Sequence, residues 1–149
     1  MYVDIQYAVD KDGLPTRREL KQWAEAALVE SRSDAEITIR IVNEEESAEL
    51  NQTYRHKNGP TNVLSFPAEV PEEVEVDLLG DLVICAPVVA REANEQKKPL
   101  KAHWAHMVVH GCLHLQGYDH QNDKQAHKME QIETNVLIKM GFNDPYQAQ

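Results

Sequence analysis

The chain has 149 residues, with 15 Lys plus Arg against 25 Asp plus Glu and a net charge of -10. At roughly 100 to 200 residues per domain, this length predicts a single domain over residues 1–149. Hydrophobic residues make up 42% and charged residues 27% of the sequence, which excludes a mostly disordered chain and a fibre. No apolar run approaches the roughly 18 residues that cross a bilayer, so we expect no membrane partner.

Hydrophobic periodicity predicts both strands and helices along the chain. Alternating apolar and polar residues indicate strands with one buried face, and apolar residues three or four apart indicate helices. In chain order, we expect strands at residues 3–7, 37–41, 63–66 and 78–85, and helices at residues 16–28, 43–54, 87–98, 100–116 and 129–140.

Local signals mark where the helices begin and end. Thr16 and Glu19 match a capping box, and Pro87 suits the first position of a helix. Gly117 and Gly141 follow apolar helical patterns and are typical helix ends. The order of elements predicts an α/β fold of the α+β-like kind, in which a small mixed sheet of about four strands carries five helices. The strand at 78–85 is the most continuously apolar, which favours a central place in the sheet.

The N-terminal residues and the cysteines predict a cytoplasmic protein. The N-terminal residues 1–6 do not begin a basic segment followed by an apolar run, so we expect no secretory signal. Two cysteines, Cys85 and Cys112, do not make a disulfide framework, and a reducing compartment is the expected location.

The negative charge is concentrated in one part of the sequence. Residues 44–81 hold ten acidic and two basic residues and so supply -8 of the net charge of -10. Both basic residues lie in the acid-free segment 50–68, and residues 69–77 are expected to form an exposed loop. Because phosphate binding draws on Lys and Arg, this distribution allows local rather than extended contact with nucleic acid. We expect no DNA partner.

The most informative feature is a cluster of histidines between residues 103 and 120. His110 and His114 are four residues apart, so on a helix they share a face and can bind one metal ion. Gly117 can end that helix in a left-handed conformation, and the following turn could bring His120 to the same ion. Three imidazoles suit one Zn²⁺ ion and leave a position open for water, which is the catalytic arrangement.

Other residues near this cluster are expected to play lesser roles. His106 is the main rival ligand, one turn before His110, although a hydrogen-bonded core histidine is the ordinary expectation for it. Cys112 lies about 200° around the helix from both ligand positions and should face away from them. A structural metal site and a chance arrangement are the alternatives to a catalytic site.

The same spacing occurs in the metzincin protease motif H-E-x-x-H-x-x-G-x-x-H. The glutamate that serves as general base in those proteases is replaced here by Gly111. Without that carboxylate, peptide hydrolysis lacks its proton shuttle. A metallopeptidase or another small metallohydrolase is therefore the alternative enzyme class.

The run His-Gly-x-Leu-His-Leu-x-Gly-Tyr-Asp-His at residues 110–120 closely resembles the signature of the YbeY family of bacterial rRNA maturation factors. Two further parts of the chain resemble that family, and the resemblance spans roughly residues 36–140. They are residues 50–55 together with 60–67, and residues 80–85.

This resemblance implies a metal-dependent endoribonuclease that is specific for single-stranded RNA. It implies a role in rRNA maturation at the 3′ end of small-subunit rRNA and in ribosome quality control, with the ribosome or ribosomal proteins as partners. It also implies zinc on His110, His114 and His120 and a functional arginine at Arg55. Asn62 departs from the Asp that many members carry, which puts any role for a carboxylate there in doubt.

Arg55 is the expected catalytic residue. Its guanidinium is planar, always protonated and suited to bidentate contact with phosphate, so we expect it to clamp the scissile group; a plain surface arginine is the alternative. Asp119 is expected to cap the last helix, with a hydrogen bond to a metal-binding residue as the alternative.

A third functional class is a non-catalytic ribosome-assembly factor whose zinc is structural.

Overall fold

The computed structural model describes residues 1–29, 34–71 and 76–147. Its four strands form one mixed sheet in which the first two strands and the fourth run parallel, and the third runs antiparallel to the fourth at one edge. The strands are β1 (Tyr2–Tyr7), β2 (Glu36–Val42), β3 (Val63–Pro67) and β4 (Leu78–Cys85), in the spatial order β1-β2-β4-β3.

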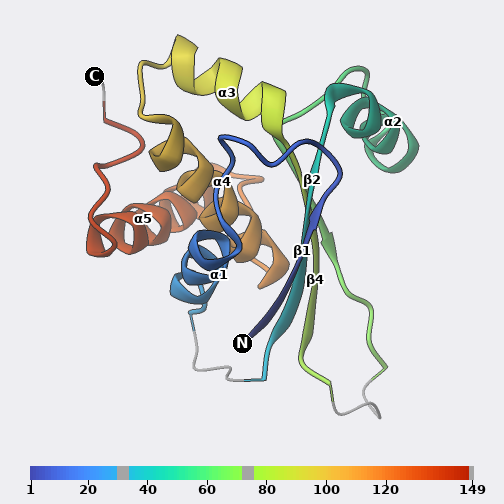
Figure 1. The fold of residues 1–149 in the computed structure, drawn as a ribbon. Helices are drawn as coiled ribbons and strands as arrows, with labels where there is room; N and C mark the ends of the chain where they lie inside the picture. Colours follow the sequence, from blue (N-terminus) through green and yellow to red (C-terminus); the bar gives the residue numbers. More distant parts are fainter. Residues whose placement is uncertain (30–33, 72–75, 148–149) are drawn as a thin grey trace.

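Five helices cover the two faces of this sheet unequally. They are α1 (Arg17–Ala26), α2 (Glu44–Arg55), α3 (Ala86–Glu95), α4 (Leu100–Leu115) and α5 (Asp123–Lys139). Figure 1 shows α1, α4 and α5 on one side of the sheet and α2 on the other. The predicted α/β fold with a small mixed sheet and five helices is therefore confirmed.

The local signals in the sequence correspond to observed helix ends and strand positions. Thr16 and Glu19 form the expected capping box at the start of α1, and β4 lies inside the sheet as expected. Helix α3 begins at Ala86, one residue before Pro87. In the segment 69–77, residues 69–71 and 76–77 contain no helix or strand, and residues 72–75 lie outside the described part.

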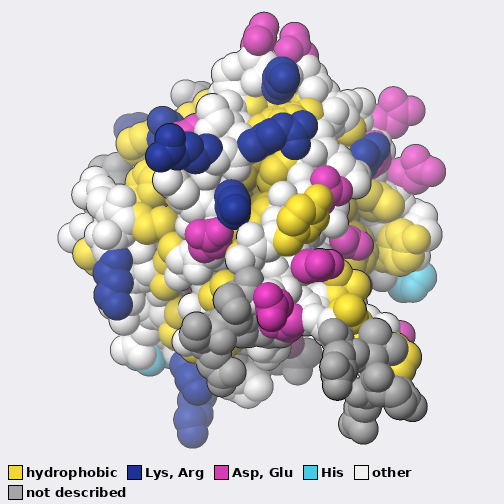
Figure 2. Space-filling model, turned by 60° about the horizontal axis from the view of Figure 1, so that its bottom comes forward, with side chains coloured by type: hydrophobic (Ala, Val, Ile, Leu, Met, Phe, Trp, Pro, Cys, Tyr) yellow, Lys and Arg dark blue, Asp and Glu magenta, His cyan; other side chains and the backbone are white. Residues whose placement is uncertain are grey.

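Charges of both signs share the surface with hydrophobic side chains. On the face in Figure 2, Lys and Arg side chains lie among Asp, Glu and hydrophobic ones. Among the residues that the structure describes, no helix has the length and apolar character needed to cross a membrane.

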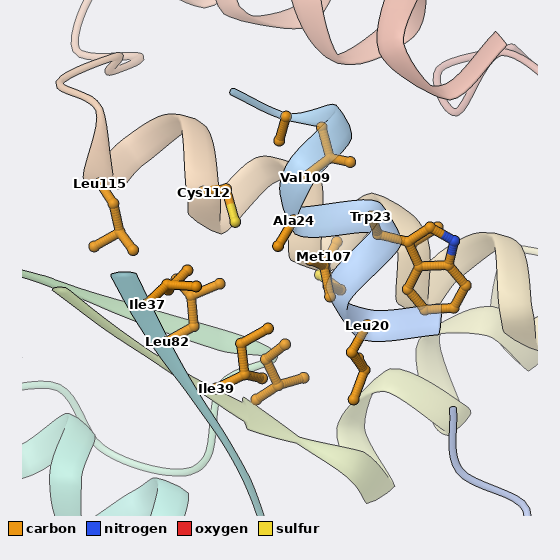
Figure 3. Packing of buried hydrophobic residues seen from close by; sticks show 14 of the residues in the cluster. Leu20, Trp23, Ala24, Ile37, Ile39, Leu82, Met107, Val109, Cys112 and Leu115 are labelled. Atoms are coloured by element: carbon orange, nitrogen blue, oxygen red, sulfur yellow. The ribbon is translucent and has the colours of Figure 1, made fainter. Parts of the chain in front are cut away.

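Helix α4 is the central helix of the fold. It packs against β3 and β4 of the sheet and against α1, α3 and α5, and residues from the sheet, α1 and α4 form the main core (Figure 3). Val108, Val109 and Leu113 of this helix are completely buried. Side chains that project from α4 are consequently held on a rigid element, as a precise functional site requires.

Gly80 allows β3 and β4 to approach each other closely. It has a φ of 136°, and a Cβ there would lie 2.2 Å from the backbone oxygen of Phe66. We expect Gly80→Ala to lower the free energy of unfolding by about 3 kcal/mol or more, because backbone strain of about 1–3 kcal/mol adds to overpacking of about 1–3 kcal/mol. Urea denaturation measures this loss.

Gly13→Ala is the matched control for this prediction. Gly13 also has a positive φ, of 78°, but nothing lies within 4 Å of a Cβ built there. It should therefore lose only the strain contribution of about 1–3 kcal/mol. Equal losses in the two variants would show that the close approach at Gly80 carries no energetic cost.

Candidate metal centre

Four histidines lie along one face of α4. His103, His106, His110 and His114 fall within about 80° of one another around the helix axis, and neighbouring rings in this row have centroids 6.2, 6.1 and 4.7 Å apart. The structure thus extends the expected pair of histidines into a continuous row.

The turn after α4 brings a fifth histidine to the end of this row. Gly117 has a φ of 97°, and its N–H donates to the carbonyl of His114 at 3.0 Å. The N–H of Tyr118 then donates to the carbonyl of Leu113 at 3.1 Å. The chain therefore reverses direction at Gly117, as predicted from the sequence. As a result, the ring centroid of His120 lies 5.1 Å from that of His114.

The three histidines of the motif converge as a metal site requires. His110 Nε2 lies 3.2 Å from His114 Nε2, and one ring nitrogen from each of His110, His114 and His120 lies within 4.8 Å of the others. Two nitrogens bound to a tetrahedral Zn²⁺ at about 2.0–2.1 Å lie roughly 3.3 Å apart, so the first pair fits such an ion.

The exposure of these ligand candidates leaves one side of the site open. His110 and His114 are half-buried and His120 is exposed. Burial lowers the pKa of His114, and the neighbouring His110 and His120 lower it further, which favours the neutral imidazole that binds metals. The group identified among the described residues has three members, as in a catalytic rather than a closed structural site.

The expectation that Asp119 caps the last helix is wrong. Asn122 is the N-cap of α5, and its side-chain oxygen accepts a hydrogen bond from the N–H of Gln125 at 2.9 Å. Asp119 instead accepts one from the N–H of His120 at 2.7 Å. Helix α5 begins at Asp123, before the predicted start at residue 129, and Asn122 stands directly before it. Asp119 lies too far from this start to cap the helix and instead helps to shape the backbone that carries His120.

A buried carboxylate on α5 supports the histidine row. Glu133 is completely buried, and it lies 2.5 Å from His110 Nδ1 and 2.8 Å from His106 Nε2. Since a carboxylate only accepts hydrogen bonds, both ring nitrogens must donate to it, and the lone pair of His110 is then on Nε2, toward His114. Carboxylate partners of this kind orient metal-binding histidines.

Glu133 was not among the site residues expected from the sequence. The sequence feature that could have pointed to it is its place on an otherwise apolar helix face, four residues after Met129 and four before Leu137. Both of these neighbours are buried. A buried charge on a core-facing position requires a partner, so this position was a recognisable candidate.

His106, His110 and Glu133 also form a group that could hold a metal ion. However, the hydrogen bonds from both histidines to Glu133 already account for their close approach. The expectation of a hydrogen-bonded core histidine at His106 is confirmed, and we regard this second group as the support of the first.

The ionisation of Glu133 should make stability depend on pH. Although burial raises the pKa of this carboxyl, hydrogen bonds from His106, His110 and Tyr146 lower it to about 2, from 4.5. A lowered pKa stabilises the folded state above pH 4.5, and this contribution disappears as the pH falls toward 2.

In metal-free protein, the wild type should lose roughly 1–2 kcal/mol more stability than Glu133→Gln between about pH 5 and pH 3. Urea denaturation at each pH measures the difference, and metal-free protein avoids a contribution from metal release. Parallel losses in the two proteins would show that Glu133 is not charged in the folded state.

Two residues of the motif face away from the centre. A Cβ on Gly111 would lie 2.6 Å from Leu82 in the sheet, so a side chain at this position would point into the core. The metzincin general base therefore has no equivalent here, which weighs against peptidase chemistry. Cys112 is fully buried in the core, and burial raises the pKa of its thiol to about 12, so it does not supply a ligand.

Arg55 lies outside the histidine group but is connected to it through one strand. Its side chain is exposed at the end of α2, and Nη2 donates to the carbonyl of Ser65 at 2.6 Å. The guanidinium also lies over the ring of Phe66, 5.3 Å from its centroid. The hydroxyl of Ser65 lies 3.5 Å from the carbonyl of Gly111, so Arg55 is fixed to the strand that packs on the histidine helix.

Asn62 belongs to a polar network at the start of the histidine row. Its side-chain amide donates to the carboxylate of Glu92 at 3.1 and 3.2 Å. The same carboxylate lies 2.9 Å from His103 Nε2. An aspartate at position 62 would place a second carboxylate next to that of Glu92, and neither could donate a hydrogen bond to the other. The amide of Asn62 supplies the donor that this position needs.

Comparison with known proteins decides the family. The model of the family described as Endoribonuclease YbeY matches residues 5–141. The chain belongs to the YbeY family. This family consists of endoribonucleases of rRNA maturation, so the chain is a nuclease of the hydrolase class and its substrate is RNA.

The fold also has a counterpart among solved structures. The solution structure of TM1509 from Thermotoga maritima has a TM-score of 0.54 and 24% sequence identity to this chain, and the similarity covers 97% of this chain and 99% of TM1509. The similarity therefore extends over the whole fold. The histidine motif falls inside the stretch that the YbeY family model matches.

Proposed function

We propose that the protein is a zinc-dependent endoribonuclease that cuts single-stranded RNA, acting at the 3′ end of small-subunit rRNA and in ribosome quality control. The observation that carries the proposal is the convergence of His110, His114 and His120 within 4.8 Å in a member of an endoribonuclease family. The proposal also implies contact with the ribosome or ribosomal proteins and a cytoplasmic location.

Each residue of the proposed site has its own role. His110 and His114 would hold the ion from one rigid helix, His120 would complete the set from the turn, and the exposed side would admit the RNA. Bound Zn²⁺ supplies an activated water near neutral pH and compensates charge on the phosphate. Glu133 holds the Nδ1 proton of His110, which keeps Nε2 free for ligation.

Arg55 is the proposed phosphate clamp. Its hydrogen bond to Ser65 and its contact with Phe66 limit the motion of a long side chain. Part of the entropy of ordering the guanidinium is thereby lost on folding rather than on substrate binding. An ordered, permanently charged fork is suited to hold the phosphate whose charge grows during cleavage.

One experiment separates this proposal from its two alternatives. Zinc-loaded and chelator-treated protein are incubated with a labelled single-stranded rRNA fragment, with the same fragment annealed to its complement, and with casein. We expect cleavage of the single strand only, and only with zinc. Cleavage of casein would support a metallopeptidase, whereas stoichiometric zinc without cleavage of any substrate would support an assembly factor with structural zinc.

A further inference from the structure

The segment that follows α5 reaches back to the carboxylate beneath the metal centre. The hydroxyl of Tyr146 donates a hydrogen bond to Glu133 Oε2 and lies 3.3 Å from His106 Nε2. The family match ends at residue 141, so Tyr146 lies beyond the matched stretch.

Several contacts hold the tyrosine in this place. Its ring meets the ring of His106 edge to face, with centroids 5.3 Å apart, and its N–H donates to Asp144 Oδ1 at 2.9 Å. The ammonium group of Lys98 donates to the carbonyl of Pro145 at 2.5 Å. The contact with His106, the hydrogen bond to Asp144 and the bond from Lys98 to Pro145 together hold Tyr146 so that its hydroxyl points at Glu133.

The hydrogen bonds of Glu133 are divided between its two oxygens. Oε1 accepts from His110, and Oε2 accepts from His106 and Tyr146. With Tyr146 in place the Glu133 side chain is completely buried, although the tyrosine itself is 47% exposed, so the printed donors to this carboxylate all come from protein groups. Without the tyrosine hydroxyl, Oε2 keeps one donor, and the carboxylate is free to turn away from His110 Nδ1.

We propose that Tyr146 is a positioning residue of the metal centre, whose hydroxyl fixes the Glu133 carboxylate and thereby holds His110 with Nε2 toward the ion. This inference rests on the proposed function in its assignment of His110 as a ligand. The C-terminal segment is then a structural part of the site, although it lies far from the motif in the sequence.

Tyr146→Phe tests the proposal because it removes the hydroxyl and keeps the ring on His106. Zinc affinity, measured by competition with a chromogenic chelator, should fall about 3- to 10-fold, less than the about 10- to 100-fold expected for Glu133→Gln. In metal-free protein, the ¹⁵N chemical shifts of the His110 ring should change from those of one tautomer to those of a mixture.

Tyr7→Phe is the matched control. It removes a hydroxyl that donates to the carbonyl of Pro15 at 2.7 Å, away from the histidine row, and should leave zinc affinity and the His110 tautomer unchanged. If Tyr146→Phe folds, binds zinc within about twofold of the wild type and keeps the His110 tautomer, the positioning role is wrong.

The outcomes also distinguish this proposal from the proposed function. Weaker zinc binding by Tyr146→Phe, in a protein that cuts no RNA, would support the positioning role and contradict the nuclease mechanism. Unchanged zinc binding by this variant, in a protein that cuts RNA with zinc, would do the reverse. A wild-type protein that binds no zinc would overturn both.

Discussion

Replacing His114 with alanine should remove zinc and RNA cleavage together. His114 Nε2 lies 3.2 Å from His110 Nε2, so the substitution removes the central member of the group and leaves two imidazoles for one ion. The fall in zinc affinity should exceed the about 10- to 100-fold that follows the loss of an outer hydrogen-bond partner. Metal analysis of the purified protein and a gel assay with labelled single-stranded RNA measure the two effects.

His127→Ala is the control for this substitution. His127 is exposed on α5 and lies outside the described histidine group, so zinc content and cleavage should match those of the wild type. Stoichiometric zinc in His114→Ala would remove His114 from the ligand set. Loss of cleavage with zinc retained would instead indicate contact with the substrate.

Replacing Arg55 with glutamate should abolish RNA cleavage while zinc content stays unchanged. The variant places a negative charge where the proposed mechanism requires a positive one next to the phosphate. Loss of a preorganised donor to developing charge costs about 10²- to 10³-fold in rate, and charge reversal should reach at least this range. Arg55→Lys keeps the charge but loses the planar fork, so its rate should be intermediate.

Arg18→Glu is matched to this charge reversal, because Arg18 is exposed on α1. It should retain near wild-type cleavage, apart from a small electrostatic effect on RNA affinity that added salt reduces. Arg18→Glu should unfold within about 0.5 kcal/mol of the wild type, as surface substitutions do. Arg55→Glu should lose roughly 1–3 kcal/mol, because it gives up the hydrogen bond to Ser65 and the contact with Phe66 and places an acid in the last turn of α2. Wild-type cleavage by Arg55→Glu would contradict the phosphate-clamp role.

The sequence predicted features that depend on neighbouring residues better than features that depend on residues far apart in the chain. The capping box at Thr16 and the helix end at Gly117 depend on residues within one turn, and both formed as expected. The prediction for Asp119 was wrong because two nearby residues compete for the same role. Asn122 lies directly before the helix and took that role.

Contacts across the fold were harder to anticipate. Glu133 meets His110 over 23 residues of sequence, and the hydroxyl of Tyr146 meets Glu133 from a segment without helix or strand. Periodicity shows that Glu133 shares a face with buried residues, but it does not show which partner lies opposite. That partner depends on how α5 packs against α4.

The sequence by itself determined the fold class and the expected metal ligands of this protein. Helical spacing sets His110 and His114 on one face whatever surrounds the helix, and Gly117 allows the turn toward His120. Only the tertiary structure decided which groups support that face and how Arg55 is held on the strand that packs against the histidine helix. Those relations depend on the packing of separate elements, which local periodicity does not encode.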